Sequence, residues 1–147
     1  MPDIQKKLLC RVTDANFNRA REGLRVCEEF TRFFLDDRGL TKALKKARSD
    51  ISRIYTGLSH NTRKALFSAR DTASDVGRAG FPFEKKKEKP VDIYWASLQR
   101  SKEALRVLEE FAKLGGPGSR SSDDFKKMRF KLYDIEKQSF KRLQKLK

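Results

Sequence analysis

DANFNRAREGLRVCEEFTRF, residues 14–33, decides the fold, because it offers both an apolar face and a dense polar face. As an α-helix it repeats apolar residues at spacings of three and four along one side. On the other side cations and carboxylates alternate, and their charges sum to zero within residues 14–33 although the whole chain carries +15. The pattern predicts an amphipathic helix with ion-paired polar side chains. Its predicted apolar side consists of Phe17, Ala20, Gly23, Leu24, Val26, Cys27, Phe30 and Phe34.

The composition of the 147 residues, 37% hydrophobic and 37% charged, fits one helical domain with a buried core and wide solvated faces. The N-terminus lacks the apolar core of a signal peptide, and no segment approaches the roughly 20 apolar residues of a membrane span, so we expect a cytoplasmic protein. Cys10 and Cys27 show no CxxC spacing, and His60 is the only histidine. Zinc sites and histidine-based nucleophilic catalysis are therefore disfavoured.

The helix repeats later in the chain. Residues 16–33 align with residues 97–114 without a gap at an offset of 81, and twelve identities over positions 16–54 predict a duplicated helical hairpin. A breaker with glycine, at 36–39 and again at 115–119, separates the two helices of each copy. We therefore predict an all-α fold, with residues 1–147 as a single helical domain. It would be an antiparallel helical bundle built from two duplicated hairpins, with the internal repeat at 16–54 and 97–135.

The other segments supply the remaining helices and an irregular region. Apolar spacing predicts helices over 40–58 and 91–114, and a fourth helix that begins with caps at 121–124. A cap at 59–62 opens a short helix, and 84–90 is a charged linker. Between them ARDTASDVGR, residues 69–78, has neither helical nor strand periodicity. Polar, irregular stretches between periodic segments commonly carry function.

The duplicated charges have two interpretations. Arg and Glu at these intervals usually form structural salt bridges, and a scaffold with two copies would need them twice. However, only the first copy begins with Asp14, Asn16 and Asn18, and only the first is followed by 69–78. This asymmetry indicates a site added to one side of the scaffold. Clustered Arg, Asp and Glu without a nucleophilic Cys or a His pair favour phosphate and Mg²⁺ binding.

Four segments together resemble a known family. They are DANFNRAREGLRVCEEF (14–30), ARDTASDVG (69–77), SKEALRVLEEFAK (101–113) and RFKLYDIEK (129–137). They resemble the small monofunctional hydroxymethylpyrimidine-phosphate kinase domain of thiamine biosynthesis, found alone or fused ahead of thiamine-phosphate synthase. The resemblance covers about residues 8–140 and, since the synthase barrel is absent, implies the standalone form. It implies transfer of the γ-phosphoryl group of ATP to 4-amino-5-hydroxymethyl-2-methylpyrimidine phosphate.

This reaction suits the composition. The acceptor phosphate is largely ionised near neutral pH, with a second pKa of about 6, so it needs no strong general base. Bringing it against ATP requires cations and a metal ion. We assign the catalytic clamp to Arg19, Arg25, Arg70 and Asp71, substrate binding to Asp14, Asn18, Glu22, Thr72 and Arg78, and Mg²⁺ binding to Asp71, Asp75, Glu22 and Glu29. Phe17, Tyr55 or Trp95 could stack on the pyrimidine, although their helical spacing favours the core.

Two other functions remain open at this stage. A pI near 10.1 also fits a helical nucleic-acid-binding protein. Against it, residues 126–147 hold a net +7 of the total +15, away from the distinctive motifs. A non-catalytic partner domain of thiamine-phosphate synthase is the other alternative. The sequence does not decide whether the chain forms a homodimer.

Overall fold

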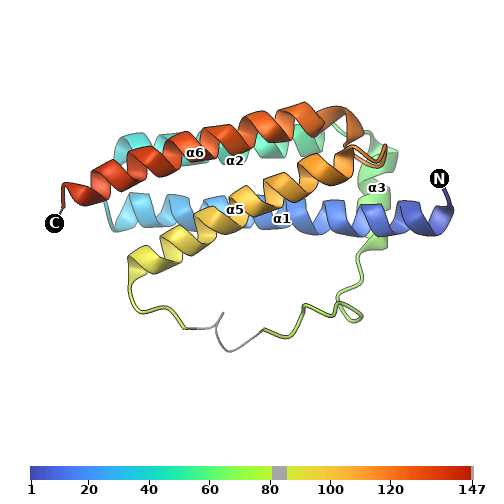
Figure 1. The fold of residues 1–147 in the computed structure, drawn as a ribbon, viewed down its shortest axis with the longest axis horizontal. Coiled ribbons are helices and arrows are strands. Elements are labelled where there is room, and N and C mark those ends of the chain that lie inside the picture. Colours follow the sequence, from blue (N-terminus) through green and yellow to red (C-terminus); the bar gives the residue numbers. More distant parts are fainter. Residues whose placement is uncertain (81–85, 147) are drawn as a thin grey trace.

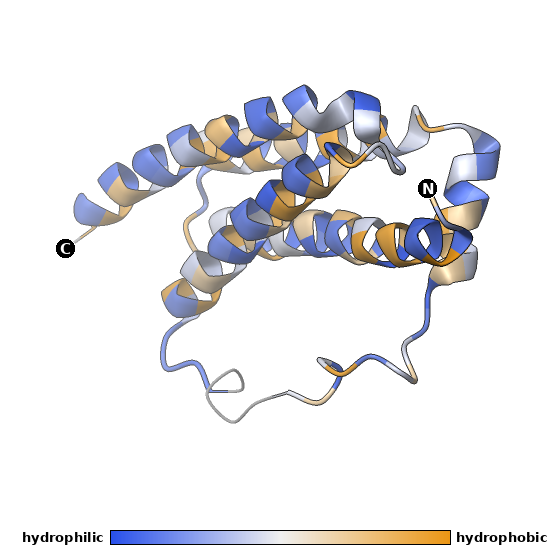
Figure 2. Cartoon of the chain, turned by 45° about the vertical axis from the view of Figure 1, so that its right-hand side comes forward, coloured by the Kyte–Doolittle hydropathy of each residue, from blue (hydrophilic) through white to orange (hydrophobic). Residues whose placement is uncertain are grey.

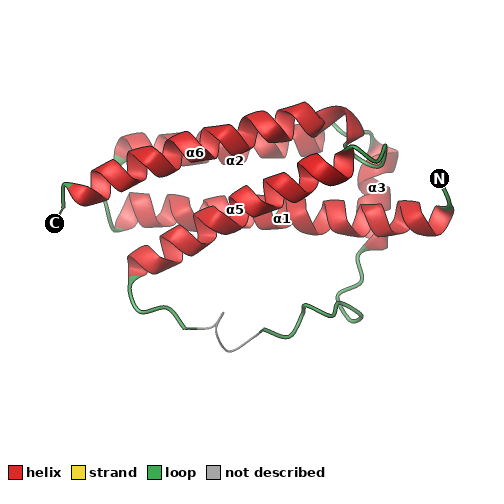
Figure 3. Ribbon diagram, viewed as in Figure 1, coloured by secondary structure: helices red, strands yellow, loops and turns green. Residues whose placement is uncertain are grey.

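A computed structural model describes residues 1–80 and 86–146, and all regular structure in these ranges is helical (Figure 3). This confirms the predicted all-α class. Residues 84 and 85 of the predicted charged linker lie outside the described residues. None of the helices in the described ranges is long and apolar enough to span a membrane. The helices are α1 (Asp3–Phe33), α2 (Arg38–Thr56), α3 (His60–Ala69), α5 (Pro90–Ala112) and α6 (Ser122–Gln144), with a 3-10 turn η1 (Ser119–Ser121) before α6.

The four long helices pack around a common core (Figure 1). α1 contacts α2 and α5, α6 contacts the same two helices, and α3 packs across the N-terminal part of α1. Fully buried side chains come from every long helix, among them Phe17, Leu44, Tyr94 and Leu132. Figure 2 shows hydrophobic residues concentrated on the helix sides that face neighbouring helices. Burial of these stripes is the main stabilising term for such a fold.

The first helix begins earlier than the decisive stretch suggests. α1 starts at Asp3, eleven residues before Asp14. Its added turns are held by tertiary contacts: Cys10 packs with Leu66 and Ala69 of α3 in a small second apolar cluster. Two positions of the predicted apolar side are wrong, because Phe34 is 67% exposed and Val26 is 38% exposed. α1 ends at Phe33, so Phe34 no longer follows the buried stripe and instead stacks on Phe30.

The helix termini carry the expected capping chemistry. The Asp37 carboxylate accepts a hydrogen bond of 2.9 Å from the Leu40 N–H at the start of α2. Ser59 caps α3 in the same way through the Thr62 N–H, which confirms the predicted cap at 59–62. α6 starts at Ser122 with two aspartates in its first turn, although Ser121 makes no capping hydrogen bond. The two aspartates still lie at the positive end of the helix dipole, where negative charge stabilises the helix.

The offset of 81 recurs in the contacts between the two copies. The Ser101 hydroxyl donates to the Ala20 carbonyl at 3.0 Å, and Lys131 lies 3.4 Å from Asp50. Both contacts join positions 81 residues apart, so equivalent residues meet where α1 crosses α5 and where α2 meets α6. The two hairpins therefore pack about an approximate twofold axis.

Within each copy, one buried ion pair joins the two helices of the hairpin. Glu28 accepts a hydrogen bond of 2.8 Å from Arg48, and Glu109 accepts one of 3.2 Å from Arg129. These are again the same two positions at an offset of 81. The structural interpretation of the duplicated charges is therefore correct for these residues.

Candidate functional site

A pocket of about 600 Å³ opens between the first half of α1 and the segment that follows α3. The irregular segment forms turns without a helix or strand between residues 71 and 80, as the sequence predicts. Residues 70–72 and 75 line the pocket together with residues of α1, and Val107 of α5 also lines it. The pocket brings together seven of the predicted site residues: Asp14, Asn18, Arg19, Arg70, Asp71, Thr72 and Asp75.

An ion pair anchors the pocket. Arg70 donates hydrogen bonds of 2.8 Å from both Nε and Nη2 to the two carboxylate oxygens of Asp14, which is only 5% exposed. The hydrogen bond with Asp14 chiefly raises the pKa of Arg70, with a smaller contribution from the charge of Glu22. The guanidinium also lies 4.4 Å from the ring centre of Phe67. Asp14 therefore neutralises Arg70, and the pair joins α1 to the residue after α3 at the wall of the pocket.

The turn after Arg70 is shaped by its own carboxylates. Asp71 accepts a hydrogen bond of 3.1 Å from the Ser74 N–H, and Asp75 accepts one of 2.8 Å from the Gly77 N–H. These local bonds explain why the segment DTASDVG forms tight turns. Backbone and side-chain hydrogen bonds from Ser74 lower the pKa of Asp71, and the nearby charge of Arg11 acts in the same direction. Asp71 is therefore ionised at neutral pH.

Two arginines supply the available positive charge. Arg11 and Arg19 both line the pocket, and neither forms an ion pair with any residue in 1–80 or 86–146. The sequence interpretation included Arg19 but missed Arg11, because it placed the start of the helix at Asp14. Extending the helix backwards would have revealed Arg11, since residues 11 and 19 lie about two turns apart on one side.

Four predicted site residues do not line this pocket: Glu22, Arg25, Glu29 and Arg78. Arg25 pairs with Glu29 at 3.0 Å, and the equivalent Arg106 pairs with Glu110 at 3.3 Å in the other copy. The i,i+4 spacing brings each pair together on the helix surface, so the same ion pair occurs at equivalent positions in the two copies. Arg25 and Glu29, for which we expected clamp and metal-binding roles, therefore lie outside the pocket that gathers the other predicted site residues.

The predicted magnesium ligands are only partly together. Across the described ranges, no group of three or more His, Cys, Asp or Glu side chains is arranged to hold a metal ion. Asp71 and Asp75 nevertheless line the same pocket. Mg²⁺ in phosphate-binding sites commonly uses one or two carboxylates and takes its other ligands from phosphate oxygens and water. Asp71 and Asp75 fit that requirement, whereas Glu22 and Glu29 lie outside the pocket.

Comparison with known proteins places the chain in a family. It is 36% identical over 132 residues to the thiamine-phosphate synthase of Nostoc punctiforme, a match that covers 89% of this chain and 35% of that protein. The thiamine-phosphate synthase of Prochlorococcus marinus is 39% identical over 129 residues, with 87% and 34% covered. The chain thus spans about a third of the length of these relatives. No solved structure matches it. The sequence model of the ThiD2 family matches residues 11–138, and this protein therefore belongs to the ThiD2 family.

Proposed function

We propose that this protein acts in thiamine biosynthesis as a kinase that transfers the γ-phosphoryl group of ATP to 4-amino-5-hydroxymethyl-2-methylpyrimidine phosphate, giving the diphosphate. The family match and the relatives named thiamine-phosphate synthase support the pathway. The observation that carries the reaction is the pocket itself, which gathers Arg11, Arg19, Asp71 and Asp75 beside the Asp14–Arg70 pair. This is the donor set that phosphate and Mg²⁺ require.

The balance of charges in the pocket defines how it would bind its substrate. Asp14 and Arg70 neutralise one another, which leaves two arginines against two aspartates. We expect Arg19 and Arg11 to bind the acceptor phosphate, with the guanidinium planes matching its oxygens. Asp71 and Asp75 would hold Mg²⁺, which offsets the charge of the transferred phosphoryl group. The dianionic acceptor should therefore bind well only when Mg²⁺ is present.

The remaining polar residues would orient the acceptor. Asn18 lines the pocket one turn before Arg21, whose Nη2 donates to the Asn18 side-chain oxygen at 3.2 Å. This bond fixes the amide, so that its NH₂ group can donate to a phosphate oxygen or a ring nitrogen. Thr72 contributes a hydroxyl from the opposite wall. No side chain needs to remove a proton from the acceptor, because the attacking oxygen is already ionised.

A second candidate function is a non-catalytic domain that assists thiamine-phosphate synthase. The specific observation in its favour is that the similar proteins bear that enzyme's name and that the chain spans only about a third of their length. In this case the pocket would bind a phosphorylated pyrimidine for the synthase without catalysing its conversion. The two candidates predict different behaviour of the isolated chain with ATP.

The experiment that separates them measures ADP release by the purified chain with ATP and Mg²⁺. The phosphorylated pyrimidine and the unphosphorylated alcohol are compared side by side. The kinase proposal predicts ADP release with the phosphate only, because the alcohol brings no charge to the arginines and would have to lose a proton. ADP release with neither compound, together with faster turnover when the chain is added to thiamine-phosphate synthase, would favour the second candidate.

A further inference from the structure

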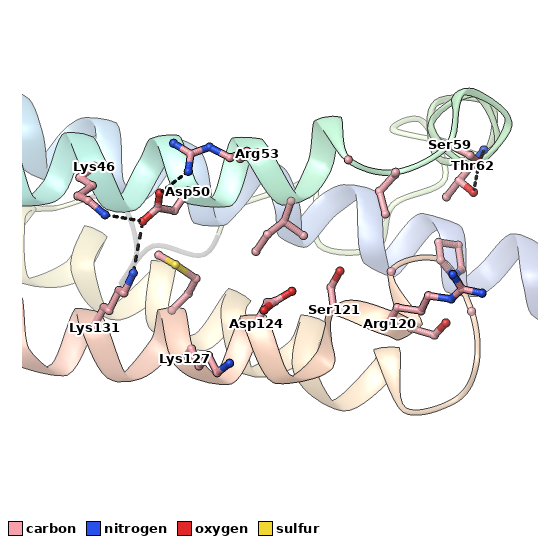
Figure 4. Close-up of a pocket in the computed structure, with 18 residues that line it drawn as sticks. Lys46, Asp50, Arg53, Ser59, Thr62, Arg120, Ser121, Asp124, Lys127 and Lys131 are labelled. Carbon is pink, nitrogen blue, oxygen red and sulfur yellow. Dashed lines mark hydrogen bonds and ion pairs between the residues drawn. The ribbon is translucent and has the colours of Figure 1, made fainter.

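A second and larger groove lies between α2 and α6, on the side of the molecule where these helices meet (Figure 4). Its volume is about 950 Å³, against about 600 Å³ for the Asp14–Arg70 pocket. Its charged lining consists of Lys46, Arg53, Arg120, Lys127 and Lys131 together with the acidic residues Asp50 and Asp124. The groove therefore carries a net charge of +3, whereas the charged side chains of the Asp14–Arg70 pocket balance to zero.

Asp50 holds the cations at one end of this groove. Its carboxylate lies 3.6 Å from Lys46, 3.6 Å from Arg53 and 3.4 Å from Lys131, as Figure 4 shows. The Asp50 side chain is only 14% exposed, so it forms a fixed centre for flexible neighbours. A single carboxylate leaves two of these three positive charges unbalanced. The arrangement orders cations without neutralising them, which is what binding of a polyanion requires.

The other end of the groove adds cations without partners. In the part of the chain that the structure describes, Arg120 and Lys127 form no ion pair with an acidic group. Lys127 and Lys46 occupy equivalent positions in the two copies, so the approximate twofold axis brings them to opposite walls. Ser59 and Thr62 in the opening turn of α3 also line the groove. The positive end of that helix dipole adds to the attraction for anions.

We propose that the groove between α2 and α6 binds a chain of two or three phosphates, such as that of a nucleoside triphosphate or an organic diphosphate. Its excess charge and its elongated lining on two helices favour several linked phosphates over a single one. The site is separate from the Asp14–Arg70 pocket. Thr62 and Arg70 lie at opposite ends of α3, about 12 Å apart at 1.5 Å per residue. The inference goes beyond the proposed reaction and does not depend on it.

The test is calorimetric titration of the whole chain with inorganic tripolyphosphate at about 0.1 M ionic strength, where long-range attraction is largely screened. The double variant Arg120→Ala/Lys127→Ala removes the two unpartnered cations. Its matched control, Lys137→Ala/Lys141→Ala, removes two exposed charges from α6 outside the groove. We expect the groove variant to bind tripolyphosphate at least about tenfold more weakly and the control to stay within about twofold of the parent protein.

Titration with ATP and with ADP identifies the source of the phosphates. Competition between ATP and tripolyphosphate, with the same loss in the groove variant, assigns the site to nucleotides. If the ATP affinity is unchanged in the groove variant, the groove binds a phosphate chain from another source. Equal tripolyphosphate affinity in the two double variants, or no binding at all, would overturn the inference. If the parent protein binds tripolyphosphate but releases no ADP with the phosphorylated pyrimidine, the proposed reaction is wrong, whereas the inference about the groove stands.

Discussion

Asp14, in the first half of α1, accepts two hydrogen bonds of 2.8 Å from Arg70, the residue directly after α3. This pair joins two segments that are 56 residues apart in the chain. The pair lies in the wall of the candidate pocket, and it neutralises one of the arginines that the sequence offered as a clamp.

Removing Arg70 should destabilise the fold through Asp14. Arg70→Ala leaves the buried carboxylate without its partner, which costs about 1–3 kcal/mol because part of the Arg70 side chain is in water. Asp14→Ala/Arg70→Ala should cost less than the sum of the single variants, since no unpaired charge is left. Urea denaturation of the three variants and the parent measures this coupling. Strictly additive effects would contradict the pairing.

Gly23 lies where α1 packs tightly against α5, and it should not tolerate a side chain. A Cβ atom there would lie 2.2 Å from the Ser101 hydroxyl oxygen and 2.8 Å from the Ser97 carbonyl oxygen. Gly23→Ala should therefore cost about 1–3 kcal/mol, despite the better helix propensity of alanine. Gly39→Ala in α2 is the matched control, because its nearest atom is 3.6 Å away. Thermal melting should show a lower midpoint for the first variant only; equal midpoints would refute the close approach.

The two equivalent ion pairs should differ in their contribution to stability. Arg129 and Glu109 are 10% and 6% exposed, whereas Arg48 is 26% exposed beside Glu28. Loss of the carboxylate leaves a more deeply buried cation in the second copy. We expect Glu109→Ala to cost about 3 kcal/mol and Glu28→Ala about 1–2 kcal/mol. Denaturant titration compares them, and a larger loss for the Glu28 variant would run against this account.

Stability should fall at alkaline pH partly through Cys27. Burial raises the pKa of this thiol from its ordinary value of 9.0 to about 12 in the folded protein. The unfolded chain therefore loses the thiol proton first, and the free energy of unfolding decreases as the pH rises from about 9 towards 12. Cys27→Ala removes this contribution, so its stability should decline less steeply between pH 8 and 10.

Unfolding in urea at several pH values measures the difference for Cys27. Cys10→Ala serves as the comparison, because burial raises the pKa of Cys10 less than that of Cys27, so this variant should follow the slope of the parent protein more closely than Cys27→Ala does. Parallel pH profiles for the parent and Cys27→Ala would show that the thiol does not contribute.

Much of the scaffold could be predicted from the sequence because its signals are local. The spacing of Phe17, Leu24 and Cys27 indicated the buried side of α1. The breaker at 115–119 falls between α5 and α6 as predicted, whereas Gly39 of the first breaker lies in the first turn of α2. The start of α1 was not predictable in this way. Residues before Asp14 include two lysines, and they stay helical because Cys10 packs on α3 and because Leu9 packs against the loop at Gly116.

In the candidate site, too, the features encoded by neighbouring residues were predictable, and those that depend on tertiary packing were not. The irregular segment and its aspartates stood out because they lack periodicity. The pairing of Arg70 with Asp14 is tertiary and could not be read from the sequence, whereas the i,i+4 pairing of Arg25 with Glu29 is local and was visible in it. The groove between α2 and α6 could not be read from either helix alone. It exists only because packing brings Asp50 and Lys131 together.

The most direct test of the account compares Arg19→Ala with Arg25→Ala in the ADP-release assay with the phosphorylated pyrimidine. The two arginines lie on the same helix, but only Arg19 lines the pocket, whereas Arg25 pairs with Glu29. The account predicts that Arg19→Ala lowers kcat/KM about 100-fold and that Arg25→Ala stays within about threefold of the parent protein. A loss in Arg25→Ala as large as that in Arg19→Ala, or full activity in both variants, would contradict it.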